Sequence, residues 1–217
     1  MVLFVDRVEA GRKLVSNLGD FAEKKNAIVL AIPRGGVVVG YEVAHALKIP
    51  LDIIIPRKIG APSNPELAIG AVTEDGIAIL DENLVAYLGV EKTYIKEESD
   101  RQRREIERRL KLYRGDIPYP NLSARSVIMV DDGVATGATI KAALASLRKR
   151  KAATVVIAVP VGPLSTIREL EEKADRVVCL FTPEEFYAIG QFYENFNQTT
   201  DEEVISLLKR SRREVEH

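Results

Sequence analysis

The sequence predicts an α/β protein with a twisted, mainly parallel sheet flanked by helices. Short apolar runs that end at turn residues alternate along the chain with amphipathic segments, which is the pattern of strand–helix–strand units. The chain has 217 residues and is 46% hydrophobic, enough to bury one sizeable core. We therefore expect a single domain over residues 1–217.

Strands are expected where runs rich in Val, Ile and Leu are bounded by Gly, Pro, Asn or Asp. The predicted strands are 27–32, 51–56, 68–73, 76–81 at an edge, 127–130, 154–160 and 176–181. Apolar residues at helical spacing predict helices at about 7–24, 37–47, 91–113 and 136–149, another ending at 172, and a last one after the capping-like "TTDEEV".

Two segments lack the regular spacing of apolar residues that is typical of a helix or a strand. Residues 57–72 ("RKIGAPSNPELAIGAV") are rich in Gly, Pro, Ser and Asn, so we expect a long flexible loop over about 57–70, returning to a strand near 68. The aromatic segment at about 182–200 is also irregular. Long loops of this kind often carry function.

Composition excludes several classes of protein. With 31 Lys and Arg against 32 Asp and Glu, the net charge of -1 gives no general attraction to nucleic acid or to anionic membranes. No apolar run approaches the ~18 residues that span a bilayer, so we expect no membrane insertion. The single Cys179 excludes an internal disulfide and favours the cytoplasm. Only His45 and His217 are histidines, too few for a multi-histidine metal site, and we expect His45 to be structural.

The stretch "VIMVDDGVATGAT", residues 127–139, has the composition of a ligand site. It begins as a buried strand and should continue into a helix, and open parallel sheets bind ligands at such strand ends. Small residues there leave backbone N–H groups free to meet a phosphate at the helix N-terminus, and Thr136 and Thr139 add hydroxyl donors. Asp131 and Asp132 would repel a phosphate, so they suit sugar hydroxyls or a magnesium ion. The chain has neither a G-x-x-x-x-G-K-[ST] loop nor G-x-G-x-x-G after a strand, which argues against a nucleotide hydrolase and a dinucleotide fold.

This stretch resembles the motif of the type I phosphoribosyltransferases that binds 5-phosphoribosyl 1-pyrophosphate (PRPP), and the chain as a whole looks most like the uncharacterised "predicted phosphoribosyltransferase" group. The resemblance implies the type I fold with a small C-terminal hood at about 182–200. It also implies that Asp131 and Asp132 bind the ribose hydroxyls and Mg²⁺. The 5-phosphate would be held by Gly133, Val134, Ala135, Thr136, Gly137, Ala138 and Thr139.

Two further segments acquire roles through the same resemblance. "PRGG" (Pro33, Arg34, Gly35, Gly36) resembles the family's pyrophosphate loop, in which the bond between the first two residues is often cis. Arg57 and Lys58 resemble the start of the catalytic loop of adenine and orotate phosphoribosyltransferases. Without the resemblance, "PRGG" could equally be an ordinary turn, and Arg57 and Lys58 would by default be surface charges at a strand end. Cations and Mg²⁺ would stabilise the departing pyrophosphate, and a closing loop would exclude water.

The resemblance leaves the acceptor of the phosphoribosyl group open. Enzymes for 6-oxopurines have a carboxylate where this chain has Ala135, whereas adenine enzymes resemble it in having alanine there. Residues Val161, Phe186, Tyr187 and Phe192 could wall or stack on a base. Equally, these aromatic residues could pack the hood against the sheet. We expect a nitrogenous base, with purine-like acceptors favoured.

The charged helix at about 91–114 allows a different function. Seven basic residues lie between Arg101 and Arg114, which could contact RNA or DNA in a regulator that senses PRPP. Acids four residues before bases, such as Glu105 and Arg109, favour instead a solvated or subunit-contacting helix. We favour the enzyme, with nucleic acid an unlikely partner, and the resemblance implies a homodimer.

Overall fold

The computed structural model describes residues 2–215 and divides into two compact units. Unit 1 contains residues 2–54, 118–136 and 151–215, and unit 2 contains residues 55–117 and 137–150. Among these residues, no helix is long and apolar enough to cross a membrane.

Unit 1 is built on a parallel sheet of five strands. Their order is β2 (Leu51–Ile53), β1 (Ala27–Ala31), β6 (Ser126–Val130), β7 (Thr154–Val161) and β8 (Arg176–Phe181), and every neighbouring pair is parallel. All of β1 and nearly all of β6 and β7 are buried, as expected for strands covered on both faces. The predicted parallel α/β architecture is confirmed.

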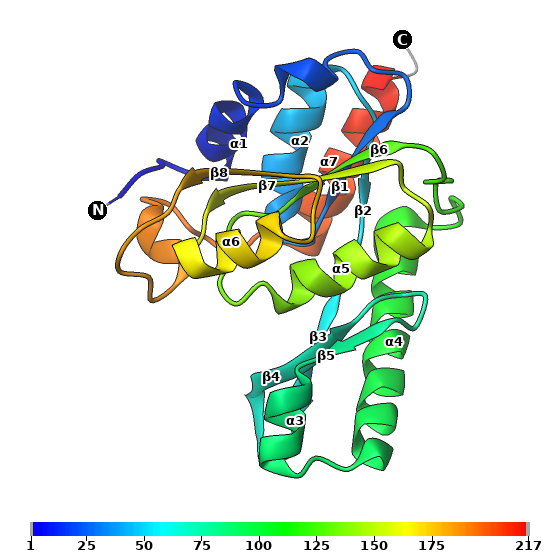
Figure 1. Ribbon diagram of the computed structural model, residues 1–217. Helices are drawn as coiled ribbons and strands as arrows, with labels where there is room; N and C mark the ends of the chain where they lie inside the picture. Colours follow the sequence, from blue (N-terminus) through cyan, green and yellow to red (C-terminus); the bar gives the residue numbers. More distant parts are fainter. Residues whose placement is uncertain (1, 216–217) are drawn as a thin grey trace. The chain divides into compact units, whose positions relative to one another are not determined.

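Helices cover the sheet of unit 1 on both sides (Figure 1). The helices are α1 (Arg7–Val15), α2 (Gly35–Leu47), α6 (Leu164–Glu171) and α7 (Asp201–Val215), with short 3₁₀ turns η1 (Gly19–Phe21) and η2 (Ile189–Phe192). Helix α2 packs against α1, α7 and β1, and α6 packs against β8 on the other side. The opening helix ends at Val15 and not near residue 24, because Asn17 and Gly19 start a turn that leads into η1.

Unit 2 contains an antiparallel sheet of three strands with three helices. The strands are β3 (Arg57–Ala61), β4 (Asn64–Val72) and β5 (Ala78–Leu80), in that order. The helices are α3 (Glu82–Leu88), α4 (Lys92–Arg114) and α5 (Ala138–Lys149). Helix α4 packs against β3, and α5 packs against β4.

The prediction of a long loop over about 57–70 in place of strands is wrong, because β3 and β4 form a hairpin there. Apolar side chains alternate along β3 and β4, and Ile59, Ala61, Ile69 and Ala71 are completely buried. The prolines and glycines that suggested a loop lie at positions where a strand can accommodate them. In particular, Pro65 lies where the register of the hairpin shifts, and a β-bulge accommodates a proline.

Candidate functional site

Two loops of unit 1 emerge side by side at the carboxyl edge of the sheet. Strands β1 and β6 are neighbours, with Ala31 opposite Val130, and the N–H of Ile32 donates to the Val130 carbonyl at 2.9 Å. The segments that follow these strands, residues 33–36 and 131–136, are the predicted pyrophosphate loop and the predicted ribose and phosphate segment. The fold therefore brings these two predicted segments together at the edge where open α/β sheets bind ligands.

Gly35 and Gly36, which are the first two residues of α2, lie directly against the carboxylates of Asp131 and Asp132. A β-carbon on Gly36 would lie 2.9 Å from Oδ1 and from the Cα of Asp131, and one on Gly35 would lie 1.9 Å from Oδ2 of Asp132. A side chain at either position would therefore have to displace a neighbouring group of the acidic pair. The peptide bond between Pro33 and Arg34 is cis, as the family resemblance implies.

Asp131 is a carboxylate in an unusual environment. Burial, and the negative charge of Asp132 beside it, raise the pKa of Asp131 well above its usual range. Its Oδ1 accepts a hydrogen bond from the backbone N–H of Asp132 at 2.8 Å. The site thus concentrates negative charge, and a bound cation or hydroxyl donors would relieve it.

Asp132 is held by groups that the sequence does not reveal. Nε of Arg7 donates to its Oδ2 at 2.7 Å, and the buried Tyr193 hydroxyl donates to its main-chain carbonyl at 2.6 Å. Burial and the charge of Asp132 raise the pKa of Tyr193, so this hydroxyl stays protonated as a donor. The sequence offers one hint about Arg7. A positive charge in the first turn of a helix interacts unfavourably with the helix dipole, so an acidic partner is expected.

The predicted phosphate segment spans both units. Its residues Gly133, Val134, Ala135 and Thr136 belong to unit 1, and Gly137, Ala138 and Thr139 belong to unit 2. In unit 1, Ala135 and Thr136 are exposed, and the Ala135 carbonyl accepts from the Thr166 hydroxyl at 2.7 Å. In unit 2, Gly137 precedes the first residue of α5 with a φ of 72°, a conformation that favours glycine. The helix begins at Ala138, two residues later than predicted.

Arg34, the cation of the pyrophosphate loop, lies near another acid. Its Nη1 is 3.7 Å from Oδ1 of Asp201, the first residue of α7. The side chains are 31% and 36% exposed, so this is a partly solvated pair of modest strength. The guanidinium remains accessible to an anion.

The predicted base-contacting residues have different environments. Val161 and Phe192 are buried in a cluster with Phe4, Ala10 and Tyr193. Phe186 is partly buried against this cluster, whereas Tyr187 is 83% exposed. The contacts of Val161 and Phe192 agree with the alternative in which these residues pack the hood against the sheet. Of these four residues, Tyr187 has an exposed aromatic ring.

The two other predicted cations lie on β3 in unit 2. Nε of Arg57 donates to Oε1 of Gln102 on α4 at 2.7 Å, while Lys58 is exposed. Burial and the nearby charge of Arg109 lower the pKa of Arg57. A pocket beside it is lined by Arg57, Arg101, Gln102, Arg104, Glu105 and Arg108.

Ion pairs with glutamates neutralise much of the positive charge of α4. Glu105 contacts both Arg108 and Arg109, and Glu98 contacts Arg101. The pair of Glu105 with Arg109 has the predicted spacing, whereas Glu98 with Arg101 is three residues apart. Hydrogen bonds from Arg108 and Arg109 lower the pKa of Glu105 to about 2. These pairs are typical of a solvated helix.

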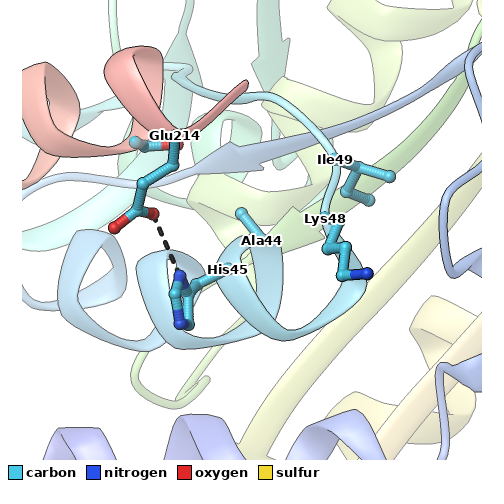
Figure 2. Close-up of a pocket in the computed structure, with 6 residues that line it drawn as sticks. Ala44, His45, Lys48, Ile49 and Glu214 are labelled. Carbon is cyan, nitrogen blue, oxygen red and sulfur yellow. Dashed lines mark hydrogen bonds and ion pairs between the residues drawn. The ribbon is translucent and has the colours of Figure 1, made fainter. Parts of the chain in front are cut away.

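His45 on α2 contacts one residue of α7 and one residue of its own helix. Its Nδ1 lies 3.0 Å from Oε2 of Glu214 on α7 (Figure 2), and its ring stacks on that of Tyr41 with centroids 5.7 Å apart. These contacts fit the predicted structural role. His217 lies outside the described residues.

Magnesium would depend on oxygen atoms from a ligand. Among residues 2–215, no group of three or more His, Cys, Asp or Glu side chains could hold a metal ion. Asp131 and Asp132 offer carboxylate oxygens, one of which Arg7 occupies. This donor set fits Mg²⁺, which proteins commonly bind through one or two carboxylates plus substrate phosphates.

The fold and these segments define an open α/β protein with a candidate ligand site at the carboxyl edge of its sheet. The chain matches the model of the phosphoribosyl transferase domain over residues 6–197, and it belongs to that family. Its mainly parallel sheet flanked by helices is the α/β fold that the sequence predicts.

The curated relatives carry names of the same family, and two solved structures are similar in fold. Two Mycobacterium tuberculosis proteins that carry provisional phosphoribosyl transferase names are 43% identical over 214 residues, or 99% of this chain and 48% of theirs. The chain thus spans about half the length of these curated relatives. The crystal structure of TT1426 from Thermus thermophilus has a TM-score of 0.82 and 40% identity, covering 96% of this chain and 99% of that one. AQ2163 from Aquifex aeolicus is similar in fold alone, with a TM-score of 0.51, 12% identity and coverage of 85% and 76%.

Proposed function

We propose that this protein is a phosphoribosyltransferase that binds PRPP with Mg²⁺ and transfers the 5-phosphoribosyl group to a nitrogenous base, releasing pyrophosphate. Asp131 and Asp132 bind the ribose hydroxyls, and residues 133–139 bind the 5-phosphate. Pro33, Arg34, Gly35 and Gly36 bind the pyrophosphate. Membership of the family supports the reaction class.

One observation in unit 1 carries the proposal. The pyrophosphate loop and the acidic pair are packed together, with Gly35 against Asp132 and Gly36 against Asp131. A ligand that presents hydroxyls beside a pyrophosphate matches this arrangement, since carboxylates accept hydrogen bonds from hydroxyls and repel phosphate. The ribose and pyrophosphate of PRPP are covalently adjacent and supply both kinds of group.

The chain's own residues would act mainly by electrostatics. As the bond to pyrophosphate breaks, negative charge grows on the leaving group, and a nearby cation stabilises it. Arg34 is the cation of the pyrophosphate loop, and Arg57 and Lys58 are the proposed catalytic cations of β3. Magnesium held by Asp131 and Asp132 would supply further positive charge to the same group.

Purine-like bases are our favoured acceptors. Ala135 leaves the family's purine-directed position without a carboxylate, which is the pattern of adenine enzymes, and Tyr187 offers an exposed aromatic ring. We further propose a homodimer in the cytoplasm, on the family resemblance and on the single Cys179.

The direct test is pyrophosphate release. The full chain is incubated with PRPP, Mg²⁺ and separate purines, pyrimidines and small amines, and pyrophosphate is followed with time. We expect release that requires one class of base. Release equal to that without any acceptor, for every compound, would contradict a transferase.

A second function rests on the arginine-lined pocket of unit 2. Four arginines and one glutamate line it, a charge balance that suits a nucleic acid phosphate. In that case the protein would be a regulator that senses PRPP and contacts RNA or DNA. Salt-dependent binding to an oligonucleotide, lost on replacing Arg103, Arg104 and Arg108 by Ala, together with no base turnover, would favour this function over the enzyme.

A further inference from the structure

Arg7 connects the acidic pair to the hood within unit 1. Its Nε donates to Oδ2 of Asp132 at 2.7 Å, and its Nη1 donates to the main-chain carbonyl of Asn197 at 2.7 Å. The guanidinium carbon also lies 3.8 Å from the centre of the Phe196 ring. A carboxylate, a carbonyl and an aromatic face therefore hold one cation.

The surroundings of this ion pair make it strong. The side chains of Arg7 and Asp132 are only 11% and 13% exposed, so water screens their attraction weakly. Arg7 is also the first residue of α1, where the helix dipole disfavours a positive charge. The contact with Asp132 offsets this unfavourable interaction with the dipole, and it fixes the orientation of that carboxylate.

The ion pair determines what Asp132 can offer a ligand. Oδ2 accepts a hydrogen bond from Nε of Arg7. The same oxygen packs against Gly35, because a β-carbon at that position would lie 1.9 Å from it. The other oxygen, Oδ1, is thus the one left for a ribose hydroxyl. In addition, Arg7 cancels one of the two adjacent negative charges that an anionic ligand would meet.

We propose that Arg7 is a positioning residue of the PRPP site. It fixes the carboxylate of Asp132, offsets its charge, and links it to the end of the hood at Phe196 and Asn197. This inference rests on the proposed function and adds a residue that the binding motif does not contain.

The test is calorimetric titration of the full chain with PRPP at saturating Mg²⁺. Arg7→Gln removes the charge and should weaken PRPP binding by about tenfold or more, as expected for a charge-assisted hydrogen bond. Arg7→Lys keeps the charge and should recover part of the loss. Arg12→Gln is the matched control, because Arg12 lies on the same helix with a 70% exposed side chain paired to Glu42, and it should bind PRPP like the unmodified chain.

A double-mutant cycle separates positioning from general support of the fold. If Arg7 acts through Asp132, adding Arg7→Gln to Asp132→Asn should change PRPP binding little beyond Asp132→Asn alone. Independent, additive losses would overturn the proposal, as would an unchanged affinity of Arg7→Gln. No binding of PRPP by the unmodified chain would overturn the proposed function itself, and this inference with it.

A milder variant covers the case in which Arg7→Gln does not fold. Phe196→Leu keeps the ion pair and removes the aromatic face under the guanidinium. We expect weaker PRPP binding, by less than in Arg7→Gln, with a thermal unfolding midpoint close to that of the unmodified chain. Unchanged affinity in Phe196→Leu would overturn the proposed link to the hood.

Discussion

Oδ2 of Asp132 occupies the space that a side chain at Gly35 would need, since a β-carbon there would lie 1.9 Å from this oxygen. Nε of Arg7 would be only 2.6 Å away from the same β-carbon. The glycine, the carboxylate and the arginine therefore form one closely packed group.

Replacement of Gly35 by alanine should disturb the proposed site. The added methyl must displace Asp132 or Arg7, so we expect a loss of about 1–3 kcal/mol in unfolding free energy, typical of overpacking, and clearly weaker PRPP binding. The measurements are urea unfolding and calorimetry. Gly19→Ala is the control, because nothing lies within 4 Å of a β-carbon at Gly19. Equal behaviour of the two variants would contradict the packing described above.

The hydroxyl of Tyr193 should contribute to stability. It donates to the Asp132 carbonyl at 2.6 Å in a buried setting, and removing one partner of a buried hydrogen bond costs about 1–3 kcal/mol. Tyr193→Phe should therefore unfold at lower urea concentration. Tyr187→Phe, in which the lost hydroxyl belongs to an 83% exposed residue, should leave the midpoint in place. A midpoint unchanged in Tyr193→Phe would show that this bond contributes nothing to stability.

Acid should destabilise unit 2 through Glu105. Hydrogen bonds from Arg108 and Arg109 hold the pKa of Glu105 at about 2, below its usual 4.5. A carboxyl group with a lowered pKa in the folded state stabilises the protein above the unfolded pKa, and that contribution disappears as pH falls toward the folded pKa. Stability should thus fall between pH 4.5 and about 2.

Glu105→Gln should reduce this pH dependence. The thermal unfolding midpoint is measured at pH 5 and at pH 3, about half a unit above and well below the usual carboxyl pKa. The difference between the two midpoints should be smaller for the variant than for the unmodified chain. Glu107→Gln, at an exposed position on the same helix, controls for the loss of charge. The same pH dependence in Glu105→Gln and the unmodified chain would contradict the role of the two arginines.

Arg57 should matter for turnover more than for binding. If its charge stabilises the departing pyrophosphate, Arg57→Gln should lower kcat by about 100-fold, the scale for losing one transition-state electrostatic contact, with a smaller change in PRPP affinity. Steady-state pyrophosphate release with the accepted base measures this. Arg104→Gln, which changes a neighbouring arginine of the same pocket, should retain activity. An equal loss in both variants would indicate a general electrostatic effect of the pocket.

Local patterns predicted much of the architecture. Alternation of apolar strands and amphipathic helices predicted the parallel sheet, and the motif around Asp131 predicted which strand end carries acids and glycines. The hairpin at 57–70 was missed because Pro62, Asn64 and Pro65 suggest a loop, whereas β3 and β4 pair and pack against α4 and α5, with Ile59 and Ile69 buried. Tertiary packing overrode local propensity there.

The sequence does not identify Arg7 and Tyr193 as the partners of Asp132. Arg7 is 125 residues away along the chain, and the hydroxyl of Tyr193 is 61 residues away. Each contact arises only when α1 and the hood pack on the sheet, and no periodicity encodes such a pairing. Likewise, only the folded structure distinguishes the buried Phe192 from the exposed Tyr187.

Calorimetric titration with PRPP and Mg²⁺ tests the central claim most directly. The unmodified chain should bind PRPP, and the double variant Asp131→Asn, Asp132→Asn should lose that binding while its thermal unfolding remains cooperative. Asp20→Asn, which changes an exposed aspartate of the same unit, should bind normally. Absence of PRPP binding by the unmodified chain, or equal binding by the double variant, would contradict a PRPP site at these two carboxylates.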